Sequence, residues 1–127
     1  MDRVRFVTHQ GKQILLIDYS GCTRQALLDI LKEGERIVLE QPPGSVLTLA
    51  DVTGVQVSKD VIEEAKKVAV RERDRVKRAA IVGIESVPKV LFDSVRTFAA
   101  REYHTFATRE EAMDWLVKED TEDTEER

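Results

Sequence analysis

The strongest constraint on the fold lies between residues 45 and 65, where a strand, a polar loop and a helix follow one another directly. Residues 46–50 (VLTLA) form a nearly continuous apolar run of strand length, which is typical of a strand covered by helices on both faces. The sequence DVTG at 51–54 then ends the strand, because Asp and Thr hydrogen-bond to nearby backbone and glycine adopts φ angles closed to other residues. This stretch therefore predicts the middle of an α/β sheet.

A helix is predicted to follow this loop. Ser58 is placed to cap its N-terminus, with the hydroxyl accepting from an otherwise unpaired backbone N–H. Apolar residues then recur at helical spacing: Val61, Ile62, Ala65, Val68 and Ala69. The basic residues that continue to Arg78 are interrupted by acids, among them Glu72, which predicts a solvated, ion-paired helix face rather than a nucleic-acid site.

The N-terminal part predicts a hairpin and a long helix. Apolar and polar residues alternate over 4–9, and Gln10-Gly11-Lys12 supplies a turn before the apolar run 14–17, which indicates two antiparallel strands. A helix is expected from about Thr23 to Glu40, with Gly34 on its buried stripe. The alternative is that Gly34 caps a shorter helix, since glycine is common just after a helix end. Pro42 and Pro43 stop the helix in either case.

The C-terminal half predicts two strands and two helices that alternate along the chain. A buried strand at 79–82 leads into a helix with Pro88 in its first turn, and a short strand at 103–106 follows. The apolar face of the first helix consists of Leu91, Phe92, Val95, Phe98 and Ala99. Thr108 and Glu111 form a capping box for the last helix. The complete order predicts a single α/β domain: an N-terminal hairpin, then alternating helices and strands, in a five-stranded mixed sheet with four helices.

Composition limits the class of protein. At 127 residues and 42% hydrophobic, the chain is long enough for one domain with a real core. It has no run of the roughly 20 apolar residues that a membrane helix needs, and no signal-peptide pattern at the N-terminus. The lone Cys22 cannot form an intramolecular disulfide. We therefore expect a cytoplasmic protein without integral membrane association.

The charge is divided unevenly along the chain. The net charge is −4, yet residues 119–127 carry six acids and one base, which leaves +1 for residues 1–118. This acidic stretch has no apolar residue to bury against its ordering entropy. We expect a domain at 1–118 and a disordered acidic tail at 119–127.

Three segments resemble the SpoIIAA-like family, a branch of the STAS and SEC14-like group of small bacterial proteins. They are QPPGSVLTLADVTG at 41–54, AAIVG at 79–83 and FATREEAMDWL at 106–116, and the resemblance extends over residues 1–118. The resemblance implies the same STAS-like α/β fold and a non-catalytic module that regulates through protein–protein interaction, with an unknown partner or a second copy in a homodimer. SEC14-like relatives imply an alternative, a binding protein for a small apolar or lipid-like ligand.

Relatives of the anti-sigma-factor-antagonist type carry a phosphorylatable serine in an Asp-Ser-x-Gly loop that opens the helix after the central strand. The corresponding segment here, VSKDV at 57–61, lacks that motif. Thr53 and Ser58 stay as candidate phosphate acceptors, although turn and cap roles account for both. This departure argues against the partner-switching role of those relatives.

Candidate site residues follow the strands, because sites in parallel sheets gather at the carboxyl ends of the strands. They are Asp18, Tyr19, Ser20, Asp51, Thr53, Ser58, Glu85 and Ser86, with Thr108 as a further candidate if the protein is an enzyme. No serine-nucleophile pattern or glycine-rich phosphate loop is present, and His9 has no second ligand near it in sequence. We therefore expect no catalysis, cofactor or metal; an enzyme or a receiver-like phospho-switch at 51–58 is the third hypothesis. The ligand carrier predicts an apolar pocket between sheet and helices, and a solid core would exclude it.

Overall fold

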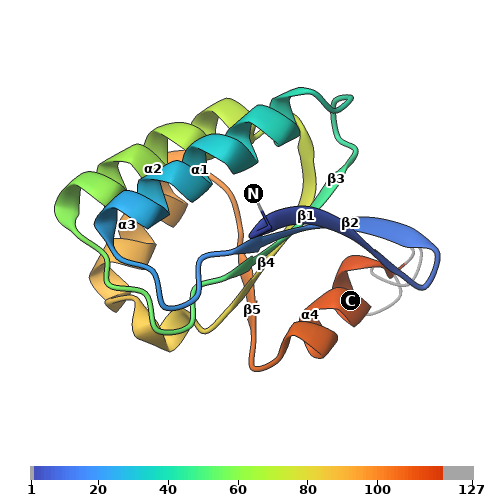
Figure 1. Cartoon of the computed structure of the whole chain (residues 1–127). Helices are drawn as coiled ribbons and strands as arrows, with labels where there is room; N and C mark the ends of the chain where they lie inside the picture. Colours follow the sequence, from blue (N-terminus) through green and yellow to red (C-terminus); the bar gives the residue numbers. More distant parts are fainter. Residues whose placement is uncertain (1, 119–127) are drawn as a thin grey trace.

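The computed structural model describes residues 2–118, which form one twisted sheet with helices on both faces (Figure 1). In chain order the elements are β1 (Val4–His9), β2 (Lys12–Asp18), α1 (Arg24–Leu39), β3 (Val46–Asp51), α2 (Lys59–Glu72), β4 (Val76–Val82), the 3₁₀ turn η1 (Ile84–Ser86), α3 (Lys89–Ala99), β5 (His104–Phe106) and α4 (Arg109–Leu116). The predicted fold class, a five-stranded mixed sheet with four helices, is confirmed for this part of the chain. The predicted acidic tail at 119–127 lies outside the described residues.

The strands lie in the sheet in the order of the sequence. β1 pairs antiparallel with β2, and β2, β3, β4 and β5 are parallel to one another. Three crossovers in succession each move one strand in the same direction, and because such crossovers are right-handed, α1, α2 and α3 all lie on one face. α4 follows the last strand and packs closely on β3, β4 and β5 from the opposite face.

Each face of the sheet has its own core. On the α4 face, Leu49, Ala112 and Leu116 are almost fully buried. On the other face, Leu15 and Ile17 of β2 pack with the apolar stripe of α1. Alternate residues of each strand supply the two cores, as the two-residue period of a strand requires.

The N-terminal hairpin turns in two residues rather than three. Gln10 and Gly11 both have positive φ, of 51° and 80°, as in the tight turns whose twist matches that of the two strands. Lys12, predicted as part of the turn, is the first residue of β2 and pairs with His9. The His9 Nε2 atom lies at hydrogen-bond distance, 2.7 Å, from the carboxylate of Asp114 in α4.

α1 continues through Gly34, so the alternative of a shorter helix capped by this glycine is wrong. The helix runs to Leu39, and Gly34 is buried against β2. A Cβ atom on Gly34 would lie 3.5 Å from Cδ1 of Ile17, an ordinary van der Waals distance. The position therefore has room for a methyl group.

We expect Gly34→Ala to raise the free energy of unfolding by about 0.5–1 kcal/mol, because alanine loses less backbone entropy than glycine in a helix. Urea unfolding followed by circular dichroism measures the change. Gly44→Ala is the matched control: Gly44 also has free space around it, but its φ of +66° strains any other residue, so this variant should lose stability. A less stable Gly34→Ala protein would contradict the packing described here.

α3 differs most from its prediction. Of the expected apolar face, Ala99 is buried, but Phe98 is 56% exposed. The helix packs on α2 rather than on the sheet. It begins at Lys89, so Pro88 occupies the capping position before the first turn and not the first turn itself.

Two further predictions of local structure need correction. The basic segment does not stay on a helix to its end, because Arg78 lies in β4, where its buried guanidinium donates to the Trp115 and Lys118 carbonyls at 3.1 and 2.8 Å. The capping box of α4 is half formed: the Glu111 N–H donates to the Thr108 hydroxyl at 3.2 Å, but the Glu111 carboxylate accepts from that hydroxyl rather than from the backbone. Among residues 2–118, no helix has the length and hydropathy needed to cross a bilayer.

Candidate functional site

The two predicted aspartates at the strand ends lie side by side. Asp18 of β2 and Asp51 of β3 are register partners in the parallel sheet. Arg109, the first residue of α4, donates from Nε to the Asp51 carboxylate at 2.8 Å and lies 3.4 Å from the Asp18 carboxylate. Like charges on neighbouring strands repel, and the guanidinium between them offsets that repulsion. We call these three residues the Asp–Arg cluster.

Hydrogen bonds hold both aspartates in the charged form. Burial opposes ionisation of Asp18 and Asp51, but hydrogen bonds from Ser20 and Thr53 and the charge of Arg109 outweigh it, so both carboxyl groups have a pKa below the ordinary value. The Ser20 hydroxyl donates to Asp18 at 2.6 Å, and the Thr53 N–H donates to Asp51 at 3.0 Å. A carboxylate held in this way is a weak base.

The remaining polar candidates have structural partners or lie apart. The Ser86 hydroxyl accepts from the Gly54 N–H at 2.7 Å, which ties the loop after β3 to the turn after β4. Ser58 occupies the predicted capping position of α2, but its hydroxyl donates to Asp60 and makes no capping bond, so the predicted position is confirmed and the predicted hydrogen bond is wrong. Glu85 is exposed. The predicted site is thus divided, and only Tyr19 of the eight candidates lines the cavity described next.

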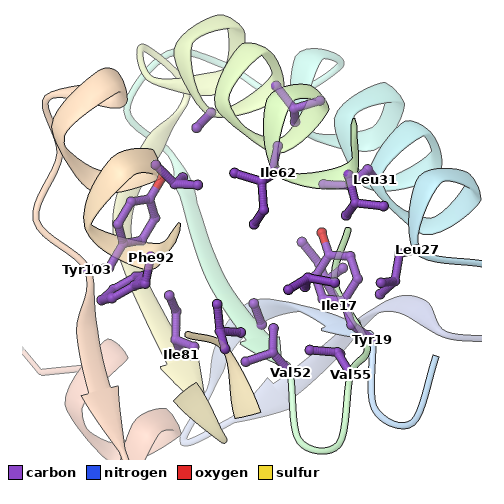
Figure 2. A pocket seen from close by; sticks show the side chains of 18 of the residues that line it. Ile17, Tyr19, Leu27, Leu31, Val52, Val55, Ile62, Ile81, Phe92 and Tyr103 are labelled. Carbon is purple, nitrogen blue, oxygen red and sulfur yellow. The ribbon is translucent and has the colours of Figure 1, made fainter. Parts of the chain in front are cut away.

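An apolar cavity of about 190 Å³ lies between the sheet and helices α1, α2 and α3. Figure 2 shows its walls, with Ile62 and Leu31 of the helices facing Ile17 and Ile81 of the sheet. Other lining residues labelled there are Tyr19, Leu27, Val52, Val55, Phe92 and Tyr103. The pocket that the ligand-carrier hypothesis requires is present.

Small side chains and the position of α3 account for the hollow. Gly34 of α1, Ala50 of β3 and Ala65 and Ala69 of α2 all line the cavity, where larger residues would fill it. α3 packs mainly on α2, and its residues Phe92 and Val95 form part of the cavity wall. The lining residues Phe92 and Val95 are only half buried, which places the rim of the cavity beside α3.

Three ionisable side chains interrupt the apolar lining: Tyr19, Glu72 and Tyr103. Burial, reinforced by the charge of Glu35 and only partly offset by Arg71 and Arg101, raises the pKa of Glu72 from 4.5 to about 7. Burial also raises the pKa of both tyrosines, and the charge of Glu72 adds to each increase. The three groups therefore act on one another electrostatically within one cavity.

Sequence reasoning missed two charged residues, Glu72 in the cavity wall and Arg109 in the Asp–Arg cluster. Glu72 was assigned to a solvated helix face, although it follows Val68 and Ala69 by four and three residues and so continues the apolar stripe of α2. That spacing was the signal that could have found it. Arg109 gave no such signal, because its pairing with residues of β2 and β3 depends on where α4 crosses the sheet.

The described part of the chain contains no group of three His, Cys, Asp or Glu side chains placed to hold a metal ion. Cys22 is buried and not in a disulfide. The expectations that the protein needs no metal or cofactor stay predictions.

The hairpin, the sequential parallel strands, the three helices on one face and α4 on the other define an α/β domain with a SpoIIAA-like fold. This fold is shared with the crystal structure of an uncharacterised DUF3478-family protein from Shewanella loihica PV-4, with a TM-score of 0.69 over 89% of this chain and 91% of that one. The two sequences are 19% identical, a level at which the similarity shows the fold alone. No protein-family model and no curated protein sequence matches this chain. The fold implied by the sequence resemblance is thus confirmed.

Proposed function

We propose that this protein binds a small apolar ligand in the cavity between the sheet and helices α1 to α3, and that it works by binding rather than by catalysis. The observation that carries the proposal is a cavity of about 190 Å³ with mostly apolar walls in a domain of this size. Protein interiors normally contain few voids larger than a water molecule.

The size of the cavity sets the size of the ligand. An engineered apolar cavity of about 150 Å³ binds benzene. The cavity described here is somewhat larger, so a single substituted ring or a short branched chain fits, and a whole phospholipid does not. The half-buried residues at the α3 rim supply a route of entry that does not require unfolding.

Native mass spectrometry of gently purified protein beside a denatured sample tests this function. A mass excess that disappears on denaturation supports a bound ligand. An excess that persists and equals one phosphate would instead support the switch at Thr53 or Ser58. A clean mass, together with no binding of ethylbenzene in an NMR titration, would refute ligand binding.

A side chain that fills the cavity should raise the stability of the protein and weaken ligand binding. We expect Ala69→Leu to raise the free energy of unfolding by about 1 kcal/mol, because the added carbons occupy the void, and to weaken ethylbenzene binding at least about tenfold. Thermal unfolding and NMR titration measure the two effects. Ala26→Leu, at an exposed position of α1, is the matched control and should change neither quantity much. Unchanged ethylbenzene affinity in Ala69→Leu would contradict this placement of the ligand.

A second function, the protein-interaction module predicted from the sequence, is favoured by the surface of α3. Val90 is 73% exposed and Phe98 is 56% exposed on this helix. Because α3 also forms the rim of the cavity, the affinity of a partner that binds α3 would depend on whether the cavity holds a ligand. Crosslinking in cell extract with and without ethylbenzene tests this coupling, and a strictly monomeric protein that captures nothing would count against it.

A further inference from the structure

We propose that the ligand is a small apolar amine, whose ammonium group pairs with the Glu72 carboxylate in the wall of the cavity. This inference rests on the proposed function and specifies the chemical class of its ligand. The apolar walls would hold the body of the ligand, and Glu72 would hold its charged end.

The Glu72 carboxylate lacks a partner of its own. It lines the cavity, and among residues 2–118 no side chain or N–H lies within hydrogen-bond or ion-pair distance of it. The two nearby cations are engaged elsewhere. Arg71 bonds to Glu35 of α1 and Glu64 of α2, and Arg101 donates to the backbone carbonyls of Arg73 and Val76. A half-buried carboxylate in this position is stabilised by a cation that enters the cavity.

The tyrosines match the donors of an ammonium group. Tyr19 and Tyr103 both line the cavity, and neither hydroxyl has a hydrogen-bond partner among the described residues. Figure 2 shows the two rings on opposite sides of the cavity, with the Tyr19 hydroxyl pointing inward. An ammonium group offers three N–H donors, so one that pairs with Glu72 keeps a further donor for a phenolic oxygen of the cavity wall.

Ligands with a carboxylate or an alcohol group would fit the Glu72 end of the cavity less well than an amine. A carboxylate ligand would repel ionised Glu72, and no free guanidinium faces the cavity from the described residues to balance it. An alcohol would bond to the tyrosines but would leave the charge of Glu72 unpaired. An amine satisfies both the charge and the hydrogen bonds.

Because Glu72 ionises, the affinity of the cavity for an amine should depend on pH. The charged and titratable groups that act on this carboxyl are Glu35 from α1, Arg71 from α2, Arg101 before β5, and the two tyrosines. With its pKa at about 7, Glu72 changes from mostly protonated to mostly charged between about pH 6 and pH 8. Affinity for an amine that stays protonated should therefore rise about tenfold over that interval.

The test compares three probes of nearly equal shape: ethylbenzene, benzyl alcohol and benzylamine, each titrated into the full chain and followed by NMR. At about pH 8, benzylamine should bind wild-type protein at least about tenfold more tightly than ethylbenzene. Glu72→Gln should remove this preference for benzylamine over ethylbenzene and the pH dependence of benzylamine binding. Glu63→Gln, which removes a carboxylate from the exposed side of α2, should preserve both.

The outcomes distinguish the two proposals. If ethylbenzene binds but benzylamine binds no more tightly, or if Glu72→Gln leaves the preference unchanged, the amine assignment is overturned and the apolar cavity function stands. If none of the probes binds, both are overturned. A preference for benzylamine that falls as pH rises through 7 would also overturn the assignment, because it would require protonated Glu72.

Discussion

Asp51→Ala is expected to lower the free energy of unfolding by about 2–3 kcal/mol at neutral pH, because it removes one partner of a buried ion pair. The Asp51 side chain is only 10% exposed and accepts from both Arg109 and the Thr53 N–H. Without it, Arg109 keeps Asp18 alone and the Thr53 N–H loses its acceptor. Arg109 is 35% exposed, so solvent moderates the loss and keeps it below that of a fully buried pair.

The pH dependence of this effect has a defined sign. Folding lowers the pKa of Asp18 and Asp51 below the ordinary 3.8, so their contribution to stability is present above that value and is lost as pH falls through the folded-state values. The difference between wild type and Asp51→Ala should therefore shrink in acid. Urea unfolding at several pH values measures it. Asp114→Ala, which breaks the exposed pair with His9, is the control and should cost less than about 1 kcal/mol.

The same variant bears on the enzyme hypothesis. Loss of a hypothetical activity in Asp51→Ala would not identify a catalytic aspartate, because the structure predicts a destabilised fold in that protein. Arg109→Met should produce a similar loss of stability by removing the shared cation. If Asp51→Ala were as stable as wild type, the structural account of the Asp–Arg cluster would be wrong.

Glu72→Gln is expected to raise the free energy of unfolding by about 2 kcal/mol near pH 8 and to lower it by about 1 kcal/mol near pH 4, where Glu72 carries no charge in the wild type. A pKa raised from 4.5 to about 7 means that ionised Glu72 destabilises the folded state by about 3 kcal/mol. Glutamine removes this penalty, but burying its amide costs about 1 kcal/mol. Thermal or urea unfolding over this pH interval measures the change.

The sign follows from proton binding. Between pH 4.5 and about 7 the folded protein keeps a proton on Glu72 that the unfolded chain has released, so wild-type stability falls as pH rises through this interval. Glu72→Gln lacks that decline. Glu63→Gln, at an exposed position of the same helix, is the matched control and should keep the wild-type pH profile. Parallel pH profiles for wild type and Glu72→Gln would show that Glu72 titrates normally.

The sequence was most informative where structure depends on neighbours along the chain. The apolar run at 46–50 and the breaking residues after it correctly placed β3, and helical spacing carried α1 correctly through Gly34. It was least informative where two distant segments meet. Asp18 and Asp51 were predicted at one edge of the sheet, but their shared partner Arg109 is 58 residues from Asp51. Its role depends on how α4 crosses the sheet, which no local pattern encodes.

By itself, then, the sequence determined the order of strands and helices and the alternation of buried positions, because periodicity and turn propensities are local properties of the chain. The SpoIIAA-like fold was implied by the resemblance of three segments to that family. Only the tertiary structure decided that α3 rests on α2, that Phe98 faces outward, and that a 190 Å³ cavity with Glu72 in its wall lies beneath the helices. The physical reason is that a cavity is the difference between the volume that the helices and sheet enclose and the volume that their side chains fill. That difference depends on how far each helix stands from the sheet, and it exists only after the elements have packed.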